Sequence, residues 1–294
     1  VAFTTSKHMA WSLNAARHLS GEESERLFAL ALERIHALDE GTYGVQNVAL
    51  TLNAIATFSM RSEHFRRLLR EDERAEQRLV QLVLSQRLED LNSWQSVSSM
   101  VNAAVHLTWS NASNTAILKH LSQATKTQLP AHGASPQSIA MIANGLSHFS
   151  YKDPAVLAML STALSAAGGK GLSAQGIGVV VNSLYRMGER DEGMLRVCCA
   201  AALLLPPSSF GPQSLALLLN GLSGLGWRDD KLVGRLSRVC MQLTPQDPEL
   251  LPQHLANIVN SYARMGQGSE EFFVHMAFLI TEFLERGSVG FKGV

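Results

Sequence analysis

A glutamine and an asparagine seven residues apart recur along the whole of this chain. The pairs are Gln46/Asn53, Gln95/Asn102, Gln137/Asn144, Gln175/Asn182, Gln213/Asn220 and Gln253/Asn260. Successive glutamines are 49, 42, 38, 38 and 40 residues apart. A degenerate copy begins the chain, with Lys7 in the glutamine place and Asn14 in the asparagine place. Repetition at this period is typical of helical-repeat solenoids, in which each repeat packs only against its neighbours.

Each copy of the motif has the pattern of one amphipathic helix, which we name the A helix. In the copy at Gly211–Gly226, Gly211 suits the N-cap, Pro212 the first helical position and Gly226 a left-handed stop. The position two residues after the glutamine is always apolar, and so are most of the positions at +5, +6 and +9. This stripe must pack against the second helix of each repeat, the B helix.

These patterns predict the fold class. We expect an all-α protein, an α-solenoid of about seven helix-turn-helix repeats with a period of about 38–40 residues, wound as a right-handed superhelix. Residues 1–287 should form a single repeat domain, and residues 288–294 a C-terminal tail. The 49-residue interval contains a charged stretch over 63–86, which we expect to be one long B helix lengthened by nearly three turns.

Two flanking positions of the A helix carry small residues in every repeat. Position +3 is Ala49, Ser98, Ala140, Gly178, Ala216 or Ala256. Position +8 is Ala54, Ala103, Gly145, Ser183, Gly221 or Ser261. Small residues on both flanks predict that adjacent A helices lie close together.

The remaining face of the A helices is polar and is the candidate binding surface. Glutamine and asparagine stand nearly above one another, and position +11 often adds histidine or arginine. The candidate RNA-binding or partner-binding residues are His18, Asn53, Asn102, His106, Asn144, His148, Asn182, Arg186, Asn220, Asn260 and Arg264. A structural interpretation stands beside this one. The asparagines could form a hydrogen-bonded ladder between repeats, and the glutamines could satisfy amides at the helix N-termini.

Composition narrows the function classes. The chain has 25 Lys and Arg against 25 Asp and Glu, so it is not strongly basic overall. Cys198, Cys199 and Cys240 form no C-x-x-C pair, which argues against a metal site or a disulfide framework. No apolar run is long enough to span a bilayer. We find no catalytic motif, metal spacing or nucleotide fingerprint, and expect no enzyme activity, cofactor or small-molecule substrate.

The cleanest copies resemble octotricopeptide repeats and the related heptatricopeptide repeats. The resemblance rests on Ser135–Ala140, Gln213–Gly226 and Gln253–Asn260, and it covers nearly the whole chain. The chain departs from the family by placing asparagine where an aromatic residue is usual. The resemblance implies a mitochondrial protein that binds organellar rRNA or mRNA, or belongs to an organellar ribonucleoprotein such as the mitochondrial ribosome.

Two binding hypotheses remain open at this point. In the first, the polar strip binds RNA, with Arg186 and Arg264 meeting phosphates and the amides meeting bases. In the second, the chain is a protein scaffold that resembles armadillo repeats in one respect, because a row of asparagines can hold the backbone of an extended peptide or a partner subunit. A positively charged groove would favour RNA, whereas a neutral groove lined by asparagines and apolar pockets would favour a peptide.

Overall fold

A computed structural model describes residues 5–37, 43–107, 109–129 and 133–285. This part of the chain contains fifteen α-helices and no strand, which confirms the all-α class. The helices are α1 (Ser6–Ala16), α2 (Glu22–Ala37), α3 (Val45–Arg61), α4 (Glu63–Glu71), α5 (Glu73–Leu84), α6 (Trp94–His106), α7 (Asn111–Thr127), α8 (Pro136–His148), α9 (Pro154–Ala167), α10 (Ala174–Met187), α11 (Glu192–Leu204), α12 (Pro212–Gly224), α13 (Asp230–Cys240), α14 (Pro252–Met265) and α15 (Glu270–Glu285). The predicted tail at 288–294 lies outside the described residues.

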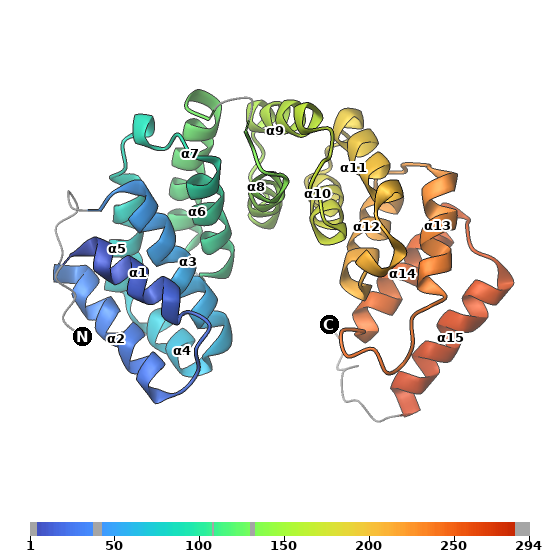
Figure 1. Cartoon of the computed structure of the whole chain (residues 1–294), viewed down its shortest axis with the longest axis horizontal. Helices are drawn as coiled ribbons and strands as arrows, with labels where there is room; N and C mark the ends of the chain where they lie inside the picture. Colours follow the sequence, from blue (N-terminus) through green and yellow to red (C-terminus); the bar gives the residue numbers. More distant parts are fainter. Residues whose placement is uncertain (1–4, 38–42, 108, 130–132, 286–294) are drawn as a thin grey trace. The chain divides into compact units, whose positions relative to one another are not determined.

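The chain divides into two compact units, which are described separately. Unit 1 covers Val1–Ala163 and unit 2 covers Leu164–Val294, so the division falls inside α9. In unit 1 the A helices α1, α3, α6 and α8 pack in sequence order, and α2, α5 and α7 are their B partners (Figure 1). In unit 2 the A helices α10, α12 and α14 pack in the same way, with α11, α13 and α15 as B helices. Each unit is therefore a stack of A/B hairpins, as the repeat pattern predicts.

Serine caps and left-handed glycines mark the ends of several A helices. The hydroxyl oxygens of Ser93, Ser135 and Ser173 accept hydrogen bonds from the amide three residues later in α6, α8 and α10. These serines, rather than the repeated glutamines, therefore cap the helices. Gly188 and Gly266 follow α10 and α14 with φ of 69° and 62°, in the left-handed region that glycine adopts at helix ends.

The predicted helical phase is confirmed by burial. All six apolar residues at position +2 are completely inaccessible to solvent: Val48, Val97, Ile139, Ile177, Leu215 and Leu255. Leu218, Leu219 and Leu222 of α12 are also fully buried. Burying one such aliphatic side chain contributes about 1.5–3 kcal/mol, so this stripe is a main source of stability for each hairpin.

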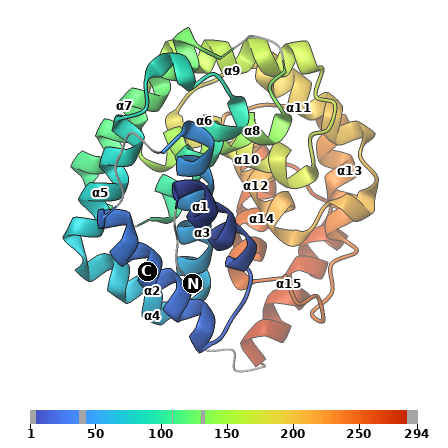
Figure 2. The same cartoon turned by 60° about the vertical axis from the view of Figure 1, so that its left-hand side comes forward.

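The long charged stretch between α3 and α6 differs from the prediction. It is not one helix, because α4 ends at Glu71 and α5 begins at Glu73. The side chain of Asp72 between them accepts a hydrogen bond from the amide of Ala75, which starts a new helix. The extra residues of the 49-residue interval thus form a separate helix, α4, whereas α5 packs beside α2 and α7 as the B helix of the repeat (Figure 2).

The small flanking residues allow close approach of the A helices, as predicted. A Cβ atom on Gly145 of α8 would lie 2.1 Å from a methyl carbon of Val101 in α6. A Cβ atom on Gly221 of α12 would lie 2.7 Å from the backbone carbon of Val181 in α10. Real Cβ atoms do not approach this closely, so a Cβ atom at Gly145 would force the Val101 side chain to shift, and one at Gly221 would force the backbone of α10 to shift.

The first and last A helices show which neighbouring helix each small position contacts. Ala10 at the +3 place of α1 is fully buried, whereas Ala15 at its +8 place is exposed. In α14 the pattern reverses, because Ser261 at +8 is fully buried and Ala256 at +3 is exposed. Position +3 therefore faces the following A helix and position +8 the preceding one.

Hydrogen bonds between neighbouring repeats recur with the same sequence separation. The Ser62 hydroxyl donates to Glu25 at 2.7 Å, and the Ser113 hydroxyl donates to Glu76 at 2.7 Å, each across 37 residues. Burial opposes ionisation of Glu76, yet the hydrogen bonds from Ser113 and Ser110 hold its pKa below the usual value. These contacts fix the register between neighbouring hairpins.

Candidate binding surface on the A helices

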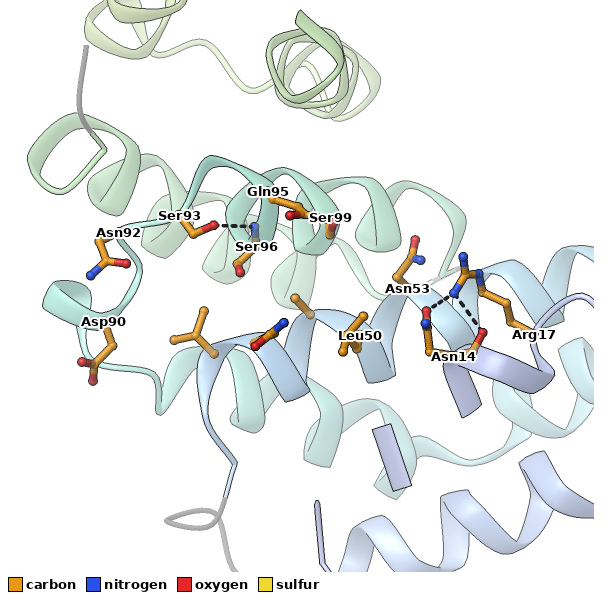
Figure 3. Close-up of a pocket in the computed structure, with 13 residues that line it drawn as sticks. Asn14, Arg17, Leu50, Asn53, Asp90, Asn92, Ser93, Gln95, Ser96 and Ser99 are labelled. Carbon is orange, nitrogen blue, oxygen red and sulfur yellow. Dashed lines mark hydrogen bonds between the residues drawn. The ribbon is translucent and has the colours of Figure 1, made fainter. Parts of the chain in front are cut away.

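A polar groove runs along the A helices of unit 1. Two adjoining cavities form it, with volumes of about 570 and 810 Å³. The first is lined from α1, α3 and the start of α6, and the second continues from α3 across α6 to the start of α8. Both share Arg17, Asn53 and Gln95 among their lining residues, so the two cavities form one continuous surface. Figure 3 shows the side chains of the first cavity.

Amide and hydroxyl groups dominate the lining of this groove. The amide side chains are Asn14, Gln46, Asn53, Asn92, Gln95 and Gln137, and the hydroxyl side chains are Ser93, Ser96, Ser98, Ser99, Ser135 and Ser138. Among the lining residues only Arg17 and Asp90 carry a charge. The Arg17 guanidinium donates to the carbonyl oxygen of Asn14 at 2.9 Å and also to the side-chain oxygen of Asn14 (Figure 3). The groove is therefore neutral and rich in both hydrogen-bond donors and acceptors.

The predicted asparagine row follows the A-helix face in both units. In unit 1, Asn53, Asn102 and Asn144 are half-buried, and Asn53 lies in the groove. In unit 2, the Asn220 amide nitrogen donates to the side-chain oxygen of Asn182 at 3.0 Å. Asn260, on the last A helix, is exposed. The structural ladder is thus present between α10 and α12, while the asparagine of α3 lines an open groove.

The residues at position +11 lie in different surroundings. His106 is half-buried at the end of α6, where burial lowers its pKa and the nearby His148 of α8 lowers it further. His148 is exposed, and its ring meets that of Phe149 edge-on with centroids 4.8 Å apart. His18 is exposed just beyond α1, where it receives a hydrogen bond from Arg17 at 3.0 Å. Arg186 and Arg264 are exposed on unit 2.

Some surface residues were not identified from the sequence. Arg17 and Asn92 line the groove but lie outside the seven-residue spacing. Tyr185 of α10 lies one residue before the +11 position, and its ring is 5.9 Å from the Arg264 guanidinium carbon of α14. Because this contact joins two A helices separated by a third, no spacing within one repeat could have indicated it.

The buried thiols have the character of core residues. Cys198, Cys199 and Cys240 are unpaired and buried, and burial raises the pKa of Cys199 and Cys240 to about 12. At neutral pH they are protonated and shielded, which makes them poor nucleophiles and poor metal ligands. In the described ranges, no group of three or more His, Cys, Asp or Glu side chains is placed to hold a metal ion.

Within the described residues, no helix combines the length and apolar character needed to cross a membrane. Comparison with models of known protein families and with curated protein sequences gives no match to this chain. The fold of the described residues is therefore assigned from the structure alone. It is an all-helical fold whose helices stack pairwise in the manner of a helical repeat.

Proposed function

We propose that this chain is a non-enzymatic helical-repeat protein that binds single-stranded RNA along its A-helix face. The amide-lined groove of unit 1 is the observation that carries the proposal. Side-chain amides present a donor and an acceptor together, which matches the edges of unpaired bases. Sequence-specific RNA recognition mostly targets such unpaired bases, and repeat proteins can read one base per helical repeat.

Charged residues at a repeated position of the A helices support RNA over other extended ligands. Arg186 and Arg264 are exposed at equivalent positions two repeats apart in unit 2. They are suited to contact phosphates, while the asparagines of the groove contact bases, so affinity and sequence preference have separate sources. His106 and His148 occupy the corresponding positions in unit 1, where burial and the nearby His148 lower the pKa of His106.

The repeat period and the motifs at Ser135–Ala140, Gln213–Gly226 and Gln253–Asn260 also suggest a cellular role. Their resemblance to octotricopeptide and heptatricopeptide repeats supports a right-handed superhelix and a place in a mitochondrial ribonucleoprotein, such as the mitochondrial ribosome. The RNA would then be an organellar rRNA or mRNA, with protein subunits as further partners.

A second function is favoured by one specific observation, the charge balance of the groove. Its two charged lining residues are one cation and one anion, Arg17 and Asp90, so the groove itself gives little attraction to a polyanion. Neutral amides can also bind the backbone N–H and C=O groups of an extended peptide. The chain would then act as a scaffold for a partner subunit.

The two functions are separated by measuring RNA affinity at several salt concentrations. Replacing Asn53 of the groove by Ala should change the preference among oligonucleotide sequences with little effect on the salt slope. Arg186→Ala should weaken binding to all sequences and lower the salt slope by about one. Arg238→Ala is the matched control, because Arg238 is also exposed but lies on the B helix α13.

An absence of salt-dependent RNA binding in the unmodified chain would refute the RNA proposal. If the chain instead binds extended peptides, and Asn53→Ala weakens that binding, the scaffold function is established. Equal losses from Arg186→Ala and Arg238→Ala would show that binding is electrostatic and not directed to the A-helix face.

A further inference from the structure

Tyr185 reaches from one A helix across the next. It begins on α10, and its ring lies directly against Gly224 near the end of α12. A Cβ atom on Gly224 would be 2.3 Å from Cδ2 and Cε2 of this ring. Position +11 is a glycine only in this repeat, so the missing side chain makes the room that the tyrosine ring occupies.

One arginine contacts this ring, and a second is its neighbour in the sequence. The guanidinium carbon of Arg264, on α14, is 5.9 Å from the ring centroid, near the outer limit for a cation–π contact. Arg186 follows Tyr185 in the chain and occupies the +11 position of α10. Both arginines are exposed, whereas Tyr185 is only half-buried and keeps part of its ring accessible.

This arrangement has the properties of a stacking site and not only of a packing contact. A packed cation–π pair shields both partners, but here the guanidinium is exposed and lies at the edge of contact range. An exposed guanidinium at this distance can cover a flat group that rests on the tyrosine ring. Aromatic rings and guanidinium planes are the two surfaces on which proteins stack unpaired bases.

We propose that Tyr185 and Arg264, seated over Gly224, form a stacking site for one nucleobase, with Arg186 contacting the adjoining phosphate. This inference rests on the proposed RNA-binding function and names a recognition element for it in unit 2. Stacking on an aromatic ring depends little on base identity, so this site adds affinity without sequence preference.

The test uses the whole chain and a short single-stranded RNA that contains the fluorescent base 2-aminopurine, whose emission falls when it stacks. Tyr185→Leu should weaken binding about tenfold, remove the fluorescence decrease and leave the salt slope unchanged. Tyr185→Phe keeps a ring and should retain both affinity and the fluorescence decrease. Arg186→Ala should instead lower the salt slope by about one.

A second variant moves the ring without deleting it. Gly224→Ala places a methyl group where the ring now lies, so the stacking signal should disappear although Tyr185 and both arginines remain. Gly234→Ala is the matched control, because a Cβ atom there meets nothing within 4 Å. Thermal melting of each variant verifies that unit 2 remains folded.

The outcomes separate this inference from the function on which it rests. If Tyr185→Leu lowers only the melting temperature and leaves RNA affinity and fluorescence unchanged, the stacking site is wrong and the contact is purely structural. If the variant at Asn53 of the groove still alters binding in that case, the RNA function stands without this site. If the unmodified chain binds no RNA, both proposals are overturned together.

Discussion

The asparagine row behaves differently in the two units, although the sequence repeats it without change. In unit 2, Asn182 and Asn220 are hydrogen-bonded to each other, whereas Asn53 in unit 1 lines an open groove. The flanking residues differ in the same sense. The α10–α12 pair has glycine at both contact positions, Gly178 and Gly221, where the pair α3 and α6 has Ala49 and Ala103. We infer that glycine lets the helices approach until the amides meet, so two methyl groups decide whether a repeated asparagine bonds to its neighbour or lines an open groove.

The largest expected effect tests whether each unit depends on its own core. Leu218→Ala in α12 and Ile142→Ala in α8 each remove a buried side chain and should lower the free energy of unfolding by about 2–4 kcal/mol. Because repeats contact mainly their neighbours, hydrogen exchange should accelerate mostly in the unit that carries the substitution. Equal acceleration in both units would show that the two units unfold as one cooperative block, which would contradict their separate stabilisation.

The next effect tests the close approach of α10 and α12. Gly221→Ala places a Cβ atom 2.7 Å from the backbone of Val181, which cannot move as a side chain can, so we expect a loss of about 1–3 kcal/mol. Gly234→Ala on the exposed face of α13 should stabilise the chain by about 0.5–1 kcal/mol, because alanine is the better helix former. Chemical denaturation measures both. Similar stability of the two variants would contradict the packing account.

A smaller effect tests the asparagine row itself. Asn182→Ala removes the hydrogen bond to Asn220 and should cost about 1 kcal/mol. Asn53→Ala in the open groove should change the unfolding free energy by less than about 0.5 kcal/mol. If Asn53→Ala proves the more destabilising of the two, the division into a structural and an open row is wrong.

The smallest effect is a pH dependence confined to unit 1. Burial and the neighbouring His148 lower the pKa of His106 in the folded chain, so the unfolded chain binds this proton more readily. The contribution of neutral His106 to stability is fully present above its unfolded pKa of about 6.5 and is lost as the pH falls through the lower folded value. His106→Asn should therefore flatten the stability profile below pH 6.5. If His106→Asn leaves the pH dependence of the unfolding free energy unchanged, other groups cause the loss of stability at acidic pH.

Several features were predictable because they depend on one helix at a time. The +2 stripe and the left-handed glycine stop at Gly226 follow from helical geometry, and the structure confirms them. The break at Asp72 was missed because the surrounding charged residues fit one continuous helix as well as two. The Asn182–Asn220 bond and the Tyr185 ring over Gly224 depend on distances between helices, which a sequence pattern does not contain.

The central claim, that the A-helix face binds RNA, is tested most directly by locating the contact. A single-stranded RNA carrying 4-thiouridine is crosslinked by light to the whole chain, and the attached peptides are identified by mass spectrometry. We expect crosslinks to peptides from α3, α6 and the start of α8, which line the groove, and to α10 around Tyr185. Crosslinks found only on the B helices α5, α7 or α13 would contradict the account.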